Sequence, residues 1–141
     1  MKAIVIGCGR VGASIAHKLR EDGWDVIAVD EKEEALSRLG ERWDGGFIVG
    51  HGMDTSVLRR AGVEEADAVI VSTDGDNTNI VVGQAVQKLF GIECVVVRLL
   101  DPNRAAFYRS QGLRVVCPTS SAIEGLDEAV RSCAVPGTTA A

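Results

Sequence analysis

Short runs of apolar, mostly β-branched residues recur along the chain and alternate with segments of helical periodicity. Two of these runs, residues 69–71 and 95–97, are continuously apolar rather than alternating. Such runs are typical of parallel strands that are covered on both faces. The same pattern predicts six strands, over residues 2–6, 25–30, 47–49, 68–72, 94–99 and 114–117.

Segments of helical periodicity with recognisable ends separate the predicted strands. The first has apolar residues at four-residue spacing and ends before Gly23. Asp54 and Asp101 are expected to cap two later helices. Ser121 and Glu124 have the spacing of a capping box for the last one. The predicted helices cover residues 10–22, 32–39, 55–61, 77–90, 102–111 and 121–133.

The alternation predicts an α/β fold, a Rossmann-like doubly wound sheet of about six parallel strands with helices on both faces. We expect one domain over residues 1–132. Its last helix, at about residues 120–132, has little sheet left to cover. Residues 133–141 are expected to form a flexible tail or a truncated linker.

A GxGxxG pattern lies between the first predicted strand and the first helix. There the first glycine permits a tight turn, the second lets a phosphate approach the backbone, and the third allows close helix packing. The helix N-terminus offers N–H groups to a pyrophosphate. We expect the arginine in the loop to contact phosphate, because a cation at a helix N-terminus needs a compensating anion. The predicted phosphate-binding loop comprises Gly7, Cys8, Gly9, Arg10, Val11 and Gly12.

Asp30 ends the second predicted strand, 18 residues after Gly12, and Glu31 follows it. A carboxylate at this place accepts hydrogen bonds from both ribose hydroxyls and repels a 2′-phosphate. No arginine follows immediately. The sequence therefore favours an adenosine nucleotide with a free ribose and disfavours NADP. The alternative is a structural glycine turn with an aspartate that only caps a helix.

Two further loops follow strands at the same edge of the sheet, where ligands bind in open α/β folds. Since a single loop histidine is more often simply solvated, we assign His51 no catalytic role. The loop residues expected to line the nucleotide site are Gly50, His51, Gly52, Thr73 and Asp74.

Arg98 ends an apolar strand and is expected to point toward this edge. A buried arginine needs an anionic partner, either Asp74 or a ligand phosphate. Asp76 or Asn77 is expected to cap the helix after the fourth strand.

Composition narrows the possible functions. The 15 basic and 20 acidic residues give a net charge of −5, which argues against nucleic acid as a partner. No apolar run approaches the roughly 18 residues that cross a bilayer, and we expect no secretion signal. The four cysteines form no CxxC pair or metal site. Three lie in or beside apolar runs, which predicts reduced, buried thiols and a cytosolic setting.

The sequence lacks an evident acid–base constellation for catalysis. Tyr108 is not followed by a lysine four residues later, because position 112 is glycine. Neither His17 nor His51 has an orienting carboxylate nearby in sequence, and no HExxH, GxSxG or P-loop is present. We therefore expect a sensor and not an enzyme.

Several segments beyond the glycine loop recur in a characteristic order. They are Gly7-x-Gly9-Arg10-x-Gly12, Asp30, Gly50-His51-Gly52-Met53-Asp54, Ala66-Asp67-Ala68-Val69, Thr73-x-x-Asp76-x-x-Asn79, Arg98, Asp101-Pro102 and Val115-Val116-x-Pro118. Together they resemble the RCK domain, also called TrkA-N or KTN, of potassium-channel and potassium-transporter regulators. The resemblance spans about residues 1–132.

The resemblance implies a cytoplasmic regulatory subunit at the inner face of the membrane. Such domains bind NAD(H), ATP or ADP at the glycine loop and gate a membrane potassium transporter or channel. The resemblance also implies a homodimer and a higher-order ring, with the last helix packed on a neighbouring subunit. His51 departs from the acidic residue common in its loop. Full-length members often carry a second, C-terminal domain, which these residues do not include.

Two alternatives remain open. The first is a small NAD-dependent oxidoreductase whose substrate site forms between subunits. The second is an NAD-redox sensor that acts on a soluble partner. Turnover of nicotinamide, followed by absorbance, distinguishes an enzyme from a regulator.

Overall fold

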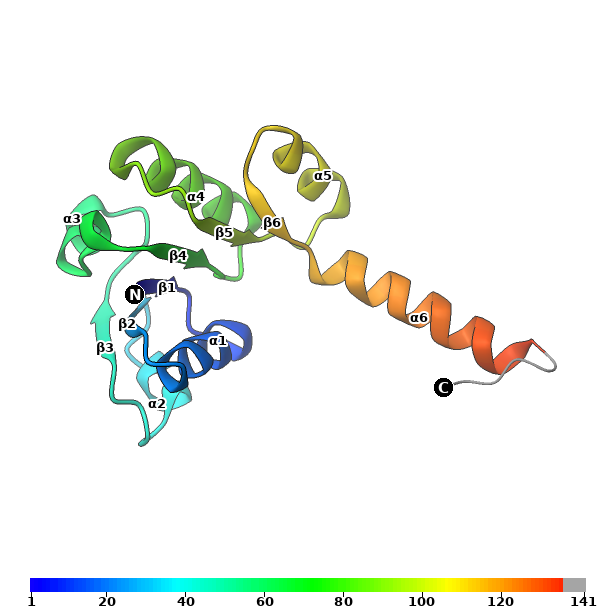
Figure 1. Cartoon of the computed structure of the whole chain (residues 1–141), viewed down its shortest axis with the longest axis horizontal. Helices are drawn as coiled ribbons and strands as arrows, with labels where there is room; N and C mark the ends of the chain where they lie inside the picture. Colours follow the sequence, from blue (N-terminus) through cyan, green and yellow to red (C-terminus); the bar gives the residue numbers. More distant parts are fainter. Residues whose placement is uncertain (136–141) are drawn as a thin grey trace.

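The backbone forms a single parallel sheet in a computed structural model that describes residues 1–135 (Figure 1). The six strands lie in the order β3-β2-β1-β4-β5-β6, and every neighbouring pair is parallel. This arrangement confirms the predicted fold class. The strands are β1 (Lys2–Ile6), β2 (Asp25–Asp30), β3 (Gly46–Val49), β4 (Ala68–Val71), β5 (Val95–Arg98) and β6 (Arg114–Val116).

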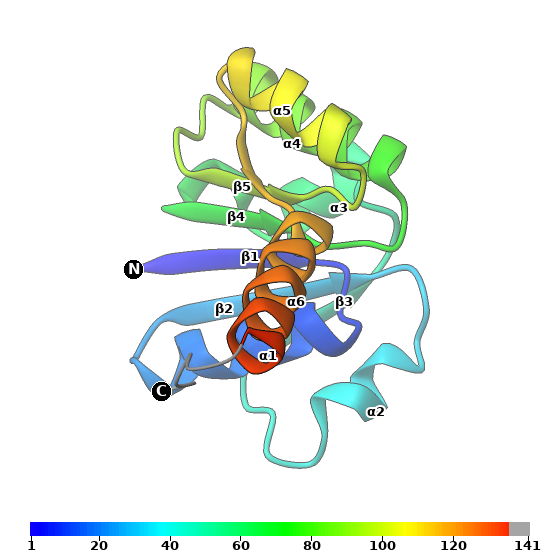
Figure 2. The same ribbon diagram turned by 90° about the vertical axis from the view of Figure 1, so that its right-hand side faces the viewer.

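Helices cover both faces of this sheet. α1 and α2 pack on one face, while α3 and α4 pack on the other (Figure 2). The helices are α1 (Arg10–Glu21), α2 (Ala35–Leu39), α3 (Thr55–Arg60), α4 (Asp76–Phe90), α5 (Pro102–Ser110) and α6 (Pro118–Ala134), with a short 3-10 turn at Val63–Glu65.

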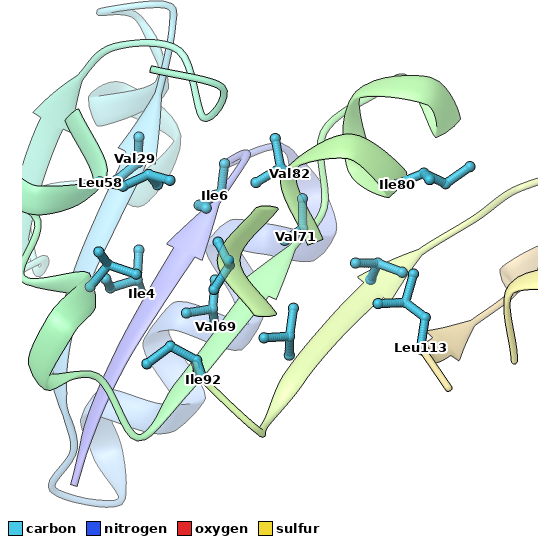
Figure 3. Packing of buried hydrophobic residues seen from close by; sticks show 14 of the residues in the cluster. Ile4, Ile6, Val29, Leu58, Val69, Val71, Ile80, Val82, Ile92 and Leu113 are labelled. Atoms are coloured by element: carbon cyan, nitrogen blue, oxygen red, sulfur yellow. The ribbon is translucent and has the colours of Figure 1, made fainter. Parts of the chain in front are cut away.

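The two faces of the sheet are packed differently. Alternate residues of β1 point to opposite sides, so Ile4 and Ile6 join branched residues of β4 and α4 in the larger cluster (Figure 3). On the other face Ala3, Ala13 and Ala16 are buried together. Because these side chains are small, α1 lies close to the sheet. That close approach places the start of α1 directly beside the end of β1.

The starts of three helices differ from the prediction. α2 begins at Ala35 rather than at residue 32. α4 is capped by Gly75, because the Asp76 carboxylate instead accepts hydrogen bonds from the backbone N–H groups of Leu100 and Asp101, at 2.9 and 3.0 Å. The prediction that Asp76 or Asn77 caps this helix was therefore wrong.

The last helix also begins earlier than predicted. α6 starts at Pro118 with Cys117 as its N-cap, because proline fits the first helical position. Ser121 therefore lies inside the helix, where its hydroxyl donates to the carbonyl of Cys117. The predicted capping box at Ser121 and Glu124 was wrong. Asp54 and Asp101 do cap α3 and α5 with their side chains, as predicted.

α6 extends away from the rest of the domain (Figure 1). None of its 17 residues is buried, and the apolar residues Ile123, Leu126 and Val130 are 57%, 72% and 55% exposed. Of the predicted tail, residues 133 and 134 are helical, and residues 136–141 lie outside the described residues. In residues 1–135 no helix combines the length and apolar character needed to span a bilayer.

The cysteines only partly follow the prediction. Cys8 and Cys117 are buried, but Cys94 is half-buried and Cys133 is exposed. None of the four is paired in a disulfide.

Candidate functional site

The glycine loop after β1 is held in a geometry that requires its glycines. Gly7 has a φ of +90°, and a Cβ there would lie 2.6 Å from the Ser72 carbonyl. A Cβ at Gly12 would overlap the carbonyl oxygen of Gly7. A Cβ at Gly9 would meet no atom within 4 Å. The loop is therefore closed beneath by Gly7 and Gly12 and open at Gly9, where a ligand can approach the backbone.

The N-terminus of α1 lies at this open position. Gly9 is the N-cap, and no side chain caps the helix. The N–H groups of Arg10, Val11 and Gly12 have no acceptor within the helix, because the first turn never supplies one. The first turn also carries no acidic residue. This end of α1 therefore offers free N–H donors and the partial positive charge of the helix dipole to an anion.

Asp30 links the glycine loop to the loop after β2. Its Oδ2 accepts a hydrogen bond from the N–H of Cys8 at 2.8 Å, and its Oδ1 accepts one from the N–H of Lys32 at 2.9 Å. Each carboxylate oxygen still has a lone pair for a further donor. The carboxylate is therefore fixed at the rim of the site and remains able to accept from a hydroxyl group.

Cys8 contributes its backbone to the site and its side chain to the core. The thiol lies near the carbonyls of Val5 and Val29 and is fully buried. Burial, followed by the negative charge of Asp30, raises the pKa of this thiol to about 12. The thiol is therefore protonated and unreactive at neutral pH.

His51 follows β3 and lies beside the end of β2, which pairs with β3. Its Nδ1 accepts a hydrogen bond from the N–H of Met53 at 3.1 Å, which assigns the ring proton of the neutral form to Nε2. That Nε2 lies 3.7 Å from a carboxylate oxygen of Glu31. Both side chains are about half exposed. The pair marks a polar rim and gives no charge-relay geometry.

The loop after β4 is held by a buried amide. Asn79 is 1% exposed, and its Oδ1 accepts hydrogen bonds from the N–H and the hydroxyl of Thr73. Its Nδ2 donates to the carbonyls of Thr73 and Arg98, at 3.1 and 2.8 Å. This network fixes Thr73 as a wall of the cleft.

Arg98 lies behind this wall. Its guanidinium donates to the Thr73 carbonyl at 2.8 Å, while its predicted partner Asp74 is 3.9 Å away and fully exposed. A backbone carbonyl, and not a carboxylate, is therefore its closest acceptor. Two polar atoms in this region, the Ser72 hydroxyl and the Arg98 Nε, are buried and have no hydrogen-bond partner among residues 1–135.

These loops enclose one cleft at the carboxyl ends of β1, β2, β3 and β4. Counted with its solvent-open mouth, it contains about 730 Å³ of space. The predicted site residues that line it are Gly7, Cys8, Gly9, Asp30, Glu31, Gly50, His51, Gly52, Thr73 and Asp74.

Four predicted residues do not line the cleft, namely Arg10, Val11, Gly12 and Arg98. Seven other residues line it, namely Ile6, Val29, Lys32, Arg38, Ser72, Gly75 and Thr78. Most of these residues adjoin a predicted strand end, so the rule that ligands bind at the carboxyl ends of parallel strands also indicates them. Arg38 has no such signal, because it reaches the cleft from α2.

The comparisons with known proteins agree with this fold. The model of the TrkA-N domain family matches residues 3–118. The Trk system potassium uptake protein TrkA of Streptomyces coelicolor is 38% identical over 116 residues, which are 82% of this chain and 52% of that protein. The chain thus spans about half the length of this relative.

Two of the similar solved structures are of GsuK with a bound nucleotide. The GsuK channel bound to NAD is 25% identical with a TM-score of 0.80, and the match covers 94% of this chain and 24% of that one. GsuK bound to ADP is 26% identical with a TM-score of 0.76, covering 89% and 32%. These matches and the family model confirm the resemblance inferred from the sequence: the chain belongs to the TrkA-N domain family.

Proposed function

We propose that this chain is a nucleotide-sensing regulatory domain, formed by residues 1–132, that binds an adenine nucleotide in the cleft. The observation that carries the proposal is the uncapped N-terminus of α1 beside the open face of Gly9, with the Asp30 carboxylate at the rim. N–H donors for an anion and a carboxylate acceptor for a hydroxyl group thus lie side by side, because Asp30 is bonded to Cys8 and the N-cap Gly9 follows Cys8. Phosphate and ribose of one nucleotide require this combination.

The residues of the cleft suit different parts of the ligand. The backbone of the glycine loop and the side chain of Arg10, an exposed residue, are proposed to hold the phosphates. Asp30 is proposed to hold the ribose hydroxyls, with Glu31 and His51 at the outer edge and Thr73 opposite. The structures of GsuK bound to NAD and to ADP support NAD(H) or ATP/ADP as the ligand class.

We assign the partner from the names of the relatives. TrkA is a potassium uptake protein and GsuK is a channel, which supports a potassium transporter or channel in the membrane, with this domain on its cytoplasmic side. Exchange of one nucleotide for another would then gate transport. The exchange shifts the equilibrium only if the two nucleotides bind two arrangements of the assembly with different affinities.

The proposed assembly is a homodimer within a larger ring. The exposed apolar residues of α6, Ile123, Leu126 and Val130, recur along one side of the helix. A second copy of the chain would present the same face and cover it. Binding to α6 would thereby connect the domains that sense the nucleotide.

Equilibrium binding tests the proposal directly. Titration calorimetry with ADP, ATP, NAD⁺ and NADH should show binding of at least one nucleotide. Asp30→Asn should weaken it by roughly tenfold to a hundredfold, since a hydrogen bond to a charged group contributes about 1.5–3 kcal/mol. Asp25→Ala, at the exposed opposite end of β2, is the matched control and should bind normally. Absence of binding to all four nucleotides would overturn the proposal.

We further propose that the domain binds its nucleotide without turning it over. The transport names of the relatives support this role. Incubation with NAD⁺ and a panel of small alcohols should leave the absorbance of reduced nicotinamide unchanged. A steady increase that depends on Asp30 would instead support the oxidoreductase alternative.

A further inference from the structure

Two basic side chains line the cleft, and neither belongs to the glycine loop. Lys32 follows β2, and Arg38 lies in the last turn of α2. α2 is fixed against α1 and the sheet by Ala35 and Leu39, which are 0% and 2% exposed. Because buried residues lie on either side of Arg38 in the sequence, α2 holds the backbone of Arg38 in place. Its guanidinium reaches the carbonyl of Cys8 in the glycine loop.

The guanidinium of Arg38 and the carboxylate of Asp30 contact the same residue. Asp30 Oδ2 accepts from the N–H of Cys8 at 2.8 Å, while Arg38 Nη1 donates to the carbonyl of Cys8 at 3.4 Å. The two opposite charges therefore lie beside the backbone of one residue of the glycine loop, Asp30 at the N–H of Cys8 and Arg38 at its carbonyl. Arg38 is thus at the ribose end of the cleft, whereas Arg10 begins α1 at the phosphate end.

Most of the hydrogen-bonding capacity of Arg38 is unused. Its one contact is long for a hydrogen bond. Among residues 1–135 no carboxylate lies within ion-pair distance of it. A guanidinium has five N–H donors in a planar fork that matches phosphate oxygens. A ligand oxygen near Asp30 would therefore meet an available cation.

We propose that Arg38 is a specificity-determining residue for the ribose 2′ position of the bound nucleotide. It donates to the 2′ oxygen while Asp30 accepts from the 2′ hydroxyl. A 2′-phosphate is then repelled by the negative charge of Asp30, although Arg38 beside it could bind a phosphate. The inference rests on the proposed function. No arginine immediately follows Asp30 in the sequence, but Arg38 lines the cleft from α2.

Binding of adenosine 5′-monophosphate and adenosine 2′,5′-bisphosphate tests the inference at constant ionic strength. Arg38→Gln should weaken the monophosphate by roughly three- to tenfold, as expected for one hydrogen bond. Asp30→Asn should strengthen the bisphosphate at least tenfold over the unmodified protein. The double variant should lose that gain. Arg42→Gln, an exposed arginine just beyond α2, is the matched control and should change neither ligand.

The outcomes separate this inference from the proposed function. If the unmodified protein binds the monophosphate but Arg38→Gln binds it equally well, the role of Arg38 is overturned and the nucleotide site stands. Equal bisphosphate binding by Asp30→Asn and the double variant has the same consequence. If no variant binds either ligand, the role of Arg38 is overturned, and the titrations with ADP, ATP, NAD⁺ and NADH decide the proposed function separately. Thermal melts of each variant check folding, which the single long contact of Arg38 should not affect.

Discussion

Asn79 joins the cleft wall to the neighbouring strand, and its replacement by alanine is predicted to destabilise the domain. The amide is 1% exposed and takes part in four hydrogen bonds, three with Thr73 and one with Arg98. Alanine keeps the helix but removes all four. The N–H of Thr73 then loses the acceptor that holds it.

The magnitude follows from these four bonds. A net contribution of about 1 kcal/mol for each gives roughly 4 kcal/mol. Part of this loss is recovered, because the Thr73 carbonyl keeps its bond from Arg98 and the Thr73 hydroxyl can turn to the carbonyl of Gly75. The expected loss in the free energy of unfolding is therefore about 3 kcal/mol.

Urea unfolding followed by tryptophan fluorescence measures this loss, since Trp24 and Trp43 are both half-buried. The matched control is Asn77→Ala, two residues earlier on α4, whose exposed amide meets only Arg104. It should change the free energy of unfolding by less than about 0.5 kcal/mol. A loss below about 1 kcal/mol for Asn79→Ala, or an equal loss for both variants, would refute the reasoning.

Three further predictions test the site. Ser72→Ala removes a buried hydroxyl without a partner, so urea unfolding should show no loss of stability or a gain of about 1 kcal/mol; a clear loss would reveal a partner. In mildly alkaline buffer Cys8 should resist alkylation while the exposed Cys133 reacts, because burial raises the pKa of Cys8 to about 12. Mass spectrometry of peptides shows which thiol is labelled, and rapid labelling of Cys8 would contradict its burial. Gly12→Ala should lower the free energy of unfolding by about 3 kcal/mol or more, because its Cβ would overlap the carbonyl of Gly7. Gly9→Ala should change the free energy of unfolding by less than about 0.5 kcal/mol in the same assay, but it should weaken nucleotide binding. Equal stabilities of the two variants would exclude the close packing at Gly12.

The strands and most helix ends could be predicted because local chemistry decides them. Continuous β-branched runs such as residues 95–97 have few stable places other than a buried strand. Gly91 ends α4 in the left-handed conformation with a φ of +65°, which glycine adopts without strain. Asp101 caps α5 with its own carboxylate. In each case the deciding interaction spans only a few residues.

The parts that could not be predicted depend on contacts between distant segments. Arg38 meets Cys8 across 30 residues, and nothing near Arg38 in the sequence indicates this contact. Asp76 is a good capping residue by type, but the backbone N–H groups of the β5–α5 turn compete for its carboxylate and take both oxygens. Gly75 is left as the cap. The residue type alone does not show whether an aspartate caps its own helix or accepts hydrogen bonds from a distant segment.

α6 carries apolar residues that the described part of the chain leaves uncovered. Ile123, Leu126 and Val130 are more than half exposed. An isolated helix of 17 residues is only marginally stable in water, because most helical stability in proteins comes from packing of the apolar face. A second copy would supply that packing, at about 1.5–3 kcal/mol for each large side chain fully buried. By mass action, helix formation in α6 and the proposed pairing of two copies are therefore one concentration-dependent equilibrium.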